Sequence, residues 1–291
     1  MKSIMKLLRP HQYVKNGFVL MGPLFAHQWD IETLGEALLA FAAFCFMASA
    51  VYVLNDLMDI DADRAHPVKC NRPLSSGKVS LNLAKRLLVL LVACSTLLSL
   101  LVSYWVTFFA VVYFIINILY SWRLKHVVIL DVFLISSGFM LRILAGTIGL
   151  GIEPTAWLLL CGLMVTLFLG FSKRRAELLV LEARDAANAT TRRVLDEYNP
   201  QMLEQFIAIT AACTIMAYGL YTVSSQTVVI HGSDNLVYTL PFVVYGIFRY
   251  LFLLYRRAKG NDTAKDLVQD PHLLITVLAW LCITIFVLYR Y

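Results

Sequence analysis

Residues 34–54 read LGEALLAFAAFCFMASAVYVL, with a single charged residue, and this stretch sets the class of fold. A helix needs roughly 20 apolar residues to cross a hydrocarbon core about 30 Å thick, and the stretch has that length. Eight other apolar stretches are similar, so the sequence predicts a polytopic membrane protein of about nine helices. The first predicted span is short and the third and fourth are nearly contiguous, which leaves a count of eight open. The predicted spans are 16–29, 34–54, 82–102, 104–120, 127–149, 155–171, 203–223, 236–255 and 272–289.

The composition agrees with a membrane protein. Of 291 residues, 59% are hydrophobic and 15% are charged, whereas a soluble domain carries about 25% charged residues. An open sheet cannot satisfy its backbone hydrogen bonds within lipid, so the spans are expected to be helices. The sequence therefore predicts an all-α helical bundle, with residues 1–291 as a single integral membrane domain.

The basic residues predict the orientation. If nine helices alternate sides and the N-terminus is cytoplasmic, all but three of the 25 Lys and Arg lie on the cytoplasmic side. The exceptions are Arg142 and Arg249, within spans, and Arg290. By the positive-inside rule, the protein is expected in the cell (inner) membrane with its N-terminus in the cytoplasm. The net charge of +6 then reflects topology and anion binding, without a nucleic acid partner. The cytoplasmic segments expected to build an active site are 55–81, 121–126, 173–202 and 256–271.

An aspartate-rich segment, NDLMDIDADR, occupies residues 55–64, directly after the second span. On a helix, Asp56, Asp59 and Asp63 would share an arc of about 60°, while Asp61 would point away. Three carboxylates on one stripe repel each other unless a cation neutralises them. Mg²⁺ typically takes one or two carboxylates plus substrate phosphates. The spacing predicts a Mg²⁺ site, and the alternative is a solvated acidic helix end.

A basic loop follows the aspartates. Residues 66–78 read HPVKCNRPLSSGK, in which two prolines and a glycine favour a defined loop. Lys69 and Arg72 offer donors for phosphate oxygens, although ordinary positive-inside charge would also explain them. His66 is interpreted as structural. Carboxylates followed by basic residues suit a metal–diphosphate complex.

The fifth span carries a polar stripe. Asp131, Gly138, Arg142, Ala145 and Gly149 fall on one side of a helix, and Arg142 lies roughly 22 Å from the start of the span. A charge at that depth is costly and usually faces a water-filled or functional cavity. Arg142 is therefore a candidate binding residue, and a structural ion pair is the alternative.

These segments resemble the UbiA superfamily of intramembrane prenyltransferases. Asn55–Asp63, Lys69 and Arg72-Pro73 are similar to its first aspartate-rich motif. The polyprenyl-phosphate phosphoribosyltransferase branch (decaprenyl-phosphate type) is more similar still. The segments that favour this branch are Arg9-Pro10 with Gln12, Lys15 and Asn16, then Tyr120–His126, Leu130-Asp131, Gly138–Arg142 and Lys173–Glu177. The resemblance implies nine helices and a diphosphate held through Mg²⁺.

One departure from the general prenyltransferase pattern follows the sixth span. The resemblance places a second aspartate motif there, but this chain has Lys173-Arg174-Arg175. A basic half-site opposite an acidic one suits two different anions, a metal-bound diphosphate and a metal-free phosphate monoester. The following stretch, 177–199, combines helix formers with mixed charge and predicts an amphipathic surface helix.

The resemblance implies transfer of 5-phosphoribosyl from phosphoribosyl diphosphate to a polyprenyl phosphate, with release of pyrophosphate. Asp56, Asp59 and Asp63 would be the catalytic metal ligands, assisted by Asn55. Lys15, Lys69 and Arg72 are expected to bind the sugar phosphate. The lipid phosphate is expected to bind to Lys125, Lys173 and Arg174, with Tyr120 orienting it. Arg142 and Glu177 are the remaining expected substrate-binding residues.

Two other functions stay open. One is a prenyltransferase that moves a prenyl group from a prenyl diphosphate to an aromatic or other small acceptor. The other is an anion transporter, which is less favoured because transporters usually bind at the midplane between repeats. Here the charged residues gather at one side of the membrane. The sequence also leaves a homo-oligomer and the lipid chain length open.

Overall fold

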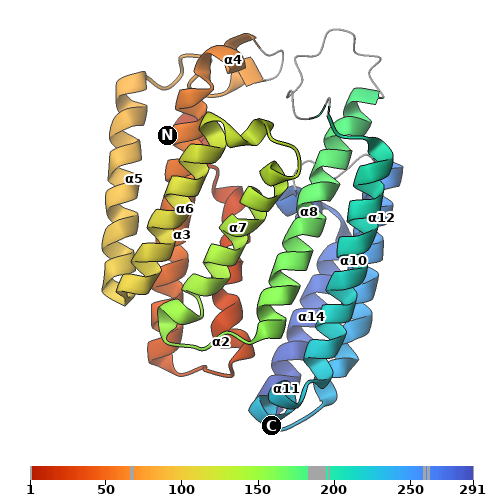
Figure 1. Ribbon diagram of the computed structural model, residues 1–291. Helices are drawn as coiled ribbons and strands as arrows, with labels where there is room; N and C mark the ends of the chain where they lie inside the picture. Colours follow the sequence, from red (N-terminus) through yellow and green to blue (C-terminus); the bar gives the residue numbers. More distant parts are fainter. Residues whose placement is uncertain are drawn as a thin grey trace. The chain divides into compact units, whose positions relative to one another are not determined.

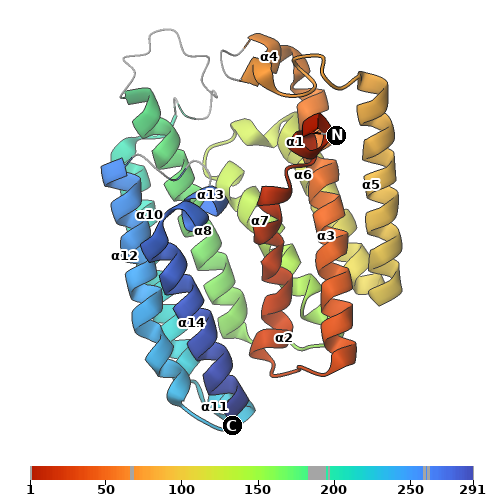
Figure 2. The same ribbon diagram turned by 180° about the vertical axis from the view of Figure 1, so that it is seen from behind.

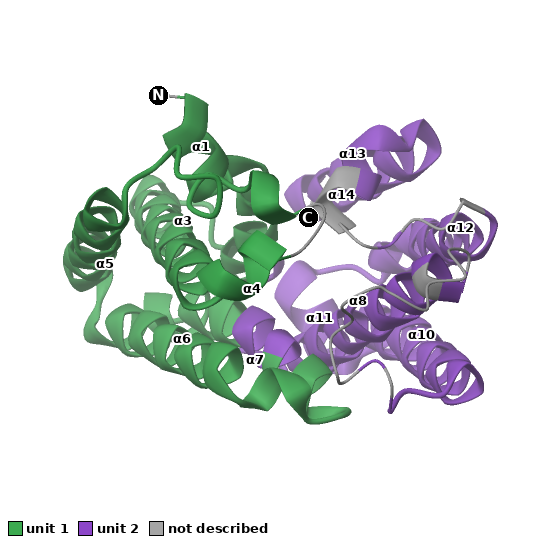
Figure 3. Ribbon diagram, turned by 90° about the horizontal axis from the view of Figure 1, so that it is seen from above, with its two compact units in different colours: residues 1–23, 28–134, 141–153 green, residues 24–27, 135–140, 154–291 purple. Residues whose placement is uncertain are grey.

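The described residues fold mainly into helices (Figure 1). The computed structural model describes residues 2–65, 69–182, 195, 197–257, 260 and 263–290, and no strand occurs among them. His66 and most of the predicted amphipathic helix over 177–199 lie outside these ranges. Two compact units are formed, and each is described by itself (Figure 3). Unit 1 contains residues 1–23, 28–134 and 141–153, and unit 2 contains residues 24–27, 135–140 and 154–291.

Unit 1 is built around one long central helix, α3, and α2 and α7 contribute residues to both units. Its elements are α1 (Lys2–Leu8), η1 (Pro10–Leu20), α2 (Met21–Phe25), α3 (Ile31–Met58), α4 (Ile60–Ala65), η2 (Lys69–Asn71), α5 (Leu81–Val102), α6 (Tyr104–Trp122), η3 (Leu124–His126), α7 (Leu130–Ala145) and η4 (Ile148–Leu150).

Besides the parts of α2 and α7 that belong to it, the described residues of unit 2 form four long helices and three short elements. They are α8 (Ala156–Glu182), α10 (Pro200–Val223), α11 (Ser225–His231), η5 (Asn235–Thr239), α12 (Leu240–Arg257), α13 (Thr263–Gln269) and α14 (Pro271–Arg290).

Eight helical stretches in the described ranges have the length and composition to cross a membrane, which confirms the polytopic all-α prediction. They correspond to all the predicted spans except the first. The predicted span 16–29 instead falls on η1 and α2, which follow each other along the chain and are each too short to span alone. The predicted count of about nine is thus met only if this broken stretch is included.

Ser103 explains why α5 and α6 are two helices. Its extended backbone (φ −166°, ψ 161°) ends α5, and its hydroxyl accepts a hydrogen bond from the backbone N–H of Val106 in the first turn of α6. The same hydroxyl donates to the carbonyl of Gly149 at 2.7 Å. A single capping residue therefore turns the chain between two spans that look continuous in the sequence.

Small side chains let α3 pack tightly against α5. Ala37, Ala40 and Ala43 are fully buried on α3, and the Ser95 hydroxyl of α5 donates to the Ala43 carbonyl at 2.7 Å. The two helices lie side by side (Figure 2). Hydrophobic burial gives little driving force between helices in lipid, so close approach and interhelical hydrogen bonds supply the contact energy.

Backbone contact between the η1–α2 stretch and the end of α7 requires glycine. A Cβ atom on Gly146 would lie 1.7 Å from the carbonyl oxygen of Val19, and one on Gly22 would lie 1.8 Å from the Gly146 carbonyl oxygen. No real Cβ tolerates such distances, so a larger residue would separate the two segments.

Gly146→Ala is expected to destabilise the detergent-solubilised protein by about 1–3 kcal/mol or more, the usual cost of overpacking. Gly35 in α3 is the matched control, because nothing lies within 4 Å of its added Cβ. Gly35→Ala should raise stability by roughly 0.4–1 kcal/mol, since it restricts the unfolded chain. The measurement is the thermal midpoint of each variant. Equal midpoints for the two variants would contradict the backbone contact.

An ion pair joins α12 to the start of α14 in unit 2. The Arg249 guanidinium donates to both carboxylate oxygens of Asp270, at 3.0 and 2.8 Å. Asp270 also accepts from the backbone N–H of Leu273 at 2.9 Å, which caps the first turn of α14. These donors, above all Arg249, lower the pKa of Asp270 from 3.8 to about 2.

Because this pKa is depressed, the stabilisation is present above pH about 4 and is lost as the pH falls toward 2. Asp270→Asn should therefore lower the thermal midpoint at neutral pH, and the difference from wild type should shrink between pH 4 and pH 2. Asp30→Asn serves as a control cap, because Asp30 caps α3 without an arginine partner in any described contact. A difference for Asp270→Asn that is constant with pH would exclude the ion pair.

Candidate functional site

The aspartate segment spans a break between two helices. α3 ends at Met58, Asp59 has φ −96° and ψ 9°, and α4 begins at Ile60. Backbone hydrogen bonds continue across the break, from Asp59 to the Asn55 carbonyl at 2.9 Å and from Asp63 to the Asp59 carbonyl at 2.7 Å. The chain therefore keeps helical hydrogen bonds while its axis changes direction.

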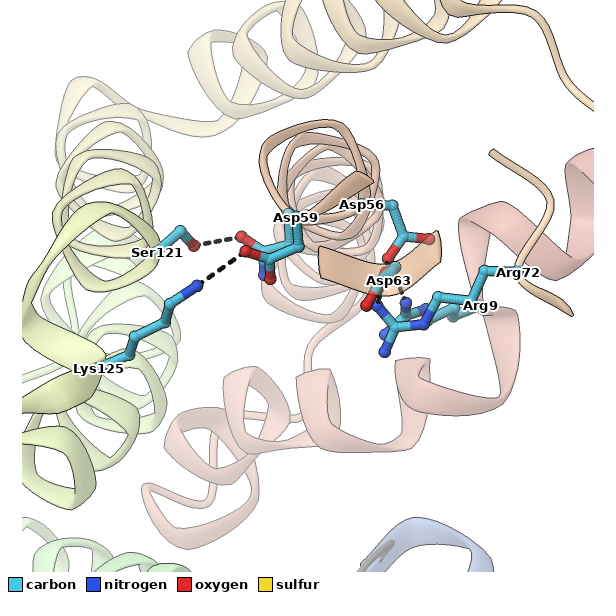
Figure 4. A network of polar contacts seen from close by, with 8 residues as sticks. Arg9, Asp56, Asp59, Asp63, Arg72, Ser121 and Lys125 are labelled. Atoms are coloured by element: carbon cyan, nitrogen blue, oxygen red, sulfur yellow. Dashed lines mark hydrogen bonds and ion pairs between the residues drawn. The ribbon is translucent and has the colours of Figure 1, made fainter. Parts of the chain in front are cut away.

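The break separates the three carboxylates that one straight helix would align. Asp56 and Asp63 lie together on one side, whereas Asp59 lies on the other, toward α6 (Figure 4). The prediction that all three share one arc is therefore wrong for Asp59. No group of three His, Cys, Asp or Glu side chains in the described ranges is placed to share a metal ion. Asp61 is exposed, as predicted, and its one ion pair among the described residues is a long contact to Arg64, at 3.4 Å.

Asp56 and Asp63 belong to a cluster of four charged residues, which we call the acid–arginine cluster: Arg9, Asp56, Asp63 and Arg72. One guanidinium nitrogen of Arg72 lies 3.1 Å from Asp56 and 2.6 Å from Asp63. Arg9 lies 2.6 Å from the same Asp56 oxygen. The carboxylates are buried, with 2% and 4% of the side chain exposed, while the arginines are partly exposed. The cluster therefore opens toward solvent through its cationic side.

Arg9 is held above the aspartates by its backbone and by an aromatic ring. It sits between α1 and η1 with left-handed φ 53° and ψ 57°, a conformation that costs a non-glycine residue about 1 kcal/mol or more. Its guanidinium carbon lies 4.9 Å from the centre of the Tyr52 ring. The Tyr13 hydroxyl pairs with Ser49 at 2.8 Å, and Ser49 donates to the Leu8 carbonyl, so both neighbouring segments are bound to α3.

The far side of the aspartate segment contacts the end of α6. Lys125 in η3 donates to Asp59 at 2.8 Å, and Ser121 forms a hydrogen bond with the side-chain oxygen of Asn55 (Figure 4). Asn55, Asp59 and Lys125, three of the predicted site residues, are thus brought together by α3 and α6. Tyr120, Lys15 and Lys69 are half-buried within unit 1.

Sequence reasoning missed two residues of this site, Arg9 and Ser121. Arg9 belongs to the Arg9-Pro10 segment, which supports the family resemblance and adds to the cytoplasmic charge, but the sequence assigns Arg9 no role in the site. Ser121 is the polar residue that ends an apolar span, next to the predicted Tyr120. No local pattern links either one to the aspartates, because the contacts join residues 47 and 66 positions apart.

Arg142 is buried inside unit 1. Its guanidinium donates to the Asn16 side-chain oxygen at 2.7 Å and to the Tyr113 hydroxyl at 3.1 Å, and it lies 4.5 Å from the Tyr113 ring centre. Asn16 in turn donates to the Cys45 sulfur at 3.2 Å. Arg142 therefore ties η1 to α6 and α7, which fixes the segment that carries Arg9 and Lys15.

The basic run at the end of α8 is mostly neutralised by acidic residues of unit 2. Arg174 is fully buried and lies 2.5 Å from Glu177. Arg175 pairs with Glu182 and Glu204 at 3.1 and 3.2 Å. Lys173 is half-buried. These contacts favour a structural role for Arg174 and Glu177, which weakens the expectation that Arg174 binds a lipid phosphate directly.

Asp56 and Asp63 suit a hard divalent cation. Their oxygens converge on one positively charged nitrogen of Arg72, the arrangement that a cation shared by two carboxylates would need. Mg²⁺ typically binds through one or two carboxylates and completes its shell with water and substrate phosphates. The two buried aspartates are therefore the best-placed metal ligands, and Asp59 would have to leave Lys125 to join them.

The apolar helices and the buried aspartate–arginine cluster at the end of α3 indicate an intramembrane protein with a binding site for ions. Residues 17–269 match the UbiA prenyltransferase family, so the chain belongs to this family. It is 36% identical to the decaprenyl-phosphate phosphoribosyltransferase of Corynebacterium glutamicum, over 99% of this chain and 87% of that protein. It is 32% identical to the enzyme of the same name from Mycolicibacterium smegmatis, over 96% and 90%.

A solved structure has the same fold. The structure of a UbiA homolog from Archaeoglobus fulgidus, bound to GPP and Mg²⁺, superposes with a TM-score of 0.71 at 17% identity, covering 99% of this chain and 98% of that one. The family and the apolar helices together make this an integral membrane protein.

Proposed function

We propose that this chain transfers 5-phosphoribosyl from phosphoribosyl diphosphate to a polyprenyl phosphate and releases pyrophosphate. The observation that carries the proposal is the 36% identity to a decaprenyl-phosphate phosphoribosyltransferase across nearly the whole of both chains. The distribution of basic residues further supports an active site facing the cytoplasm, where a soluble sugar phosphate is available.

Asp56 and Asp63, with Asp59, are the residues that would hold Mg²⁺ in this proposal. A bound divalent cation would supply positive charge where negative charge develops on the leaving pyrophosphate. Arg9, Arg72 and Lys69 donate hydrogen bonds to the phosphate oxygens, and Asn55 contributes polar contacts beside them. Lys15, which lies in η1, is the proposed contact for the 5-phosphate.

The bond between ribose C1 and the diphosphate oxygen breaks, and its electron pair leaves with pyrophosphate. C1 develops oxocarbenium character, as sugars do at such displacements. An oxygen of the lipid phosphate then forms the new bond to C1. This nucleophile is already an anion, so the site needs no general base. Lys125 and Tyr120, both in unit 1, are the candidates for binding the acceptor phosphate.

A second candidate is prenyl transfer to an aromatic or other small acceptor, which the family name and the GPP-bound relative favour. The two functions differ in donor. Purified protein with Mg²⁺ and a polyprenyl phosphate should release pyrophosphate from phosphoribosyl diphosphate, and only when the lipid phosphate is present. Geranyl diphosphate with an aromatic acid should give none. Prenylation of the acid without a ribosyl-lipid product would select the second function.

Asp56→Asn, Asp59→Asn and Asp63→Asn should each lower pyrophosphate release by about 10²-fold or more, the scale for removing one charge-stabilising group. Asp61→Asn is the matched control in the same segment, and because Asp61 is exposed its loss should be under about threefold. Chelation of divalent cations should abolish the reaction, and added Mg²⁺ should restore it. An Asp61 variant as impaired as the Asp56 variant would contradict this assignment.

A further inference from the structure

The short N-terminal helix α1 has a basic face and an apolar face. Lys2 and Lys6 are one turn apart, so they lie about 40° from each other around the helix, whereas Leu7 and Leu8 lie on the opposite side. Leu7 is fully buried in the core of unit 1, and Leu8 packs against the same core. Both lysines are exposed. The apolar face therefore fixes α1 to unit 1 and leaves its basic face outward.

α1 lies across the direction of the long helices α3 and α5 (Figures 2 and 3). The chain makes this turn at Arg9, whose left-handed backbone (φ 53°) ends α1 while its N–H still bonds to the Met5 carbonyl at 3.2 Å. Since α3 and α5 have the length and composition to cross a membrane, a helix that lies across them runs along the membrane surface.

The depth of α1 is set by its contact with α3. The Leu8 carbonyl accepts a hydrogen bond from the Ser49 hydroxyl at 2.9 Å. Along the helix, Ser49 lies about 8 Å from residue 54, where the apolar span predicted from the sequence ends. Amphipathic helices on a membrane are typically buried by about 5–10 Å at the boundary between headgroups and acyl chains. α1 therefore lies at the depth of this boundary.

The outward side of α1 suits an anion with an apolar part. Neither Lys2 nor Lys6 forms an ion pair with a residue that the structure describes. Like charges one helical turn apart repel each other, so an anion bound beside both would relieve the repulsion. Met5, on the same turn, exposes 54% of its surface. An acidic headgroup with acyl chains below it matches this combination of charge and apolar surface.

We infer that α1 is an interfacial helix that binds the phosphate headgroups of anionic phospholipids, in the leaflet that the basic residues predict to be cytoplasmic. Lys2 and Lys6 bind the headgroup phosphates, and Met5 contacts the upper part of the acyl chains. The inference goes beyond the proposed function, because it involves neither the donor nor the acceptor of the transfer.

Two other occupants fit the basic face less well. A zwitterionic phospholipid carries no net charge to compensate the two lysines. A second copy of the chain that docked through the same face would bring four lysines together, because a two-fold contact pairs the same surface patch with itself. Anionic lipid headgroups attract basic residues beside a membrane surface, and the attraction is screened by salt.

The experiment measures hydrogen–deuterium exchange of the full chain in nanodiscs. One set contains phosphatidylcholine alone, and the other contains phosphatidylcholine mixed with phosphatidylglycerol. In wild type, the amides of residues 6–9 should exchange about tenfold more slowly when phosphatidylglycerol is present, because two basic residues are attracted to the anionic surface. High salt should remove most of this difference. In Lys2→Gln/Lys6→Gln, the two lipid mixtures should give the same exchange.

Matched variants separate the role of α1 from folding and from net charge. Equal exchange of wild type and Lys2→Gln/Lys6→Gln in phosphatidylcholine alone would show that α1 is folded in both. Lys2→Arg/Lys6→Arg keeps the charge and should keep the lipid effect. Lys85→Gln/Arg86→Gln removes two exposed charges from α5 and should leave the exchange of α1 as in wild type. A lipid effect lost equally in this variant would assign it to net charge and overturn the inference.

The remaining outcomes identify other ligands. Protection of α1 by inorganic phosphate in phosphatidylcholine alone would show a site for a soluble anion, and it would overturn the inference. A change of oligomeric state in Lys2→Gln/Lys6→Gln, with no lipid effect in wild type, would assign the face to a second copy and overturn it as well. None of these measurements uses phosphoribosyl diphosphate or a polyprenyl phosphate, so the result is independent of the proposed function.

Discussion

Two buried carboxylates at the end of a membrane helix must be neutralised, and much of unit 1 is organised around that requirement. Arg72, from the loop that follows α4, neutralises both Asp56 and Asp63. Arg9, from the N-terminal segment, neutralises Asp56 as well. Removing one member of a buried ion pair typically costs about 3–5 kcal/mol. The N-terminal segment is thereby tied to the aspartates, and the contacts of Tyr13, Asn16 and Arg142 hold it there.

The same rule governs the other charges inside the helices. Arg142 is surrounded by Asn16 and the Tyr113 ring, Arg174 pairs with Glu177, and Arg249 forms a two-point contact with Asp270. A charge within a membrane helix is expensive and usually signals function. Here, however, the contacts of Arg142 and Arg249 join different helical elements to one another. At the α3–α4 break, by contrast, the arginines that neutralise the buried aspartates are partly exposed.

The two groups of charged residues, at the α3–α4 break and at the end of α8, differ in how well they suit the binding of phosphate. The sequence suggested an acidic half-site for a metal-bound diphosphate and a basic half-site for a phosphate monoester. In the structure, the aspartate side already carries its own arginines, and the basic run of α8 is compensated by glutamates within unit 2. Phosphate recognition is therefore better supported around Arg9, Arg72 and Lys125 than around Arg174. The family assignment is unaffected, because it rests on residues 17–269 as a whole.

The sequence by itself determined the helical membrane fold, the spans after the first and the aspartate segment, because apolar length and residue spacing are local properties. It also predicted that Asp61 points away from the other aspartates. Only the tertiary structure decided that Asp59 parts from Asp56 and Asp63, and that Arg9 and Ser121 join the site. The reason is that these features depend on partners 47 to 66 residues away, whose attraction for a carboxylate or amide overrides the phase of a regular helix.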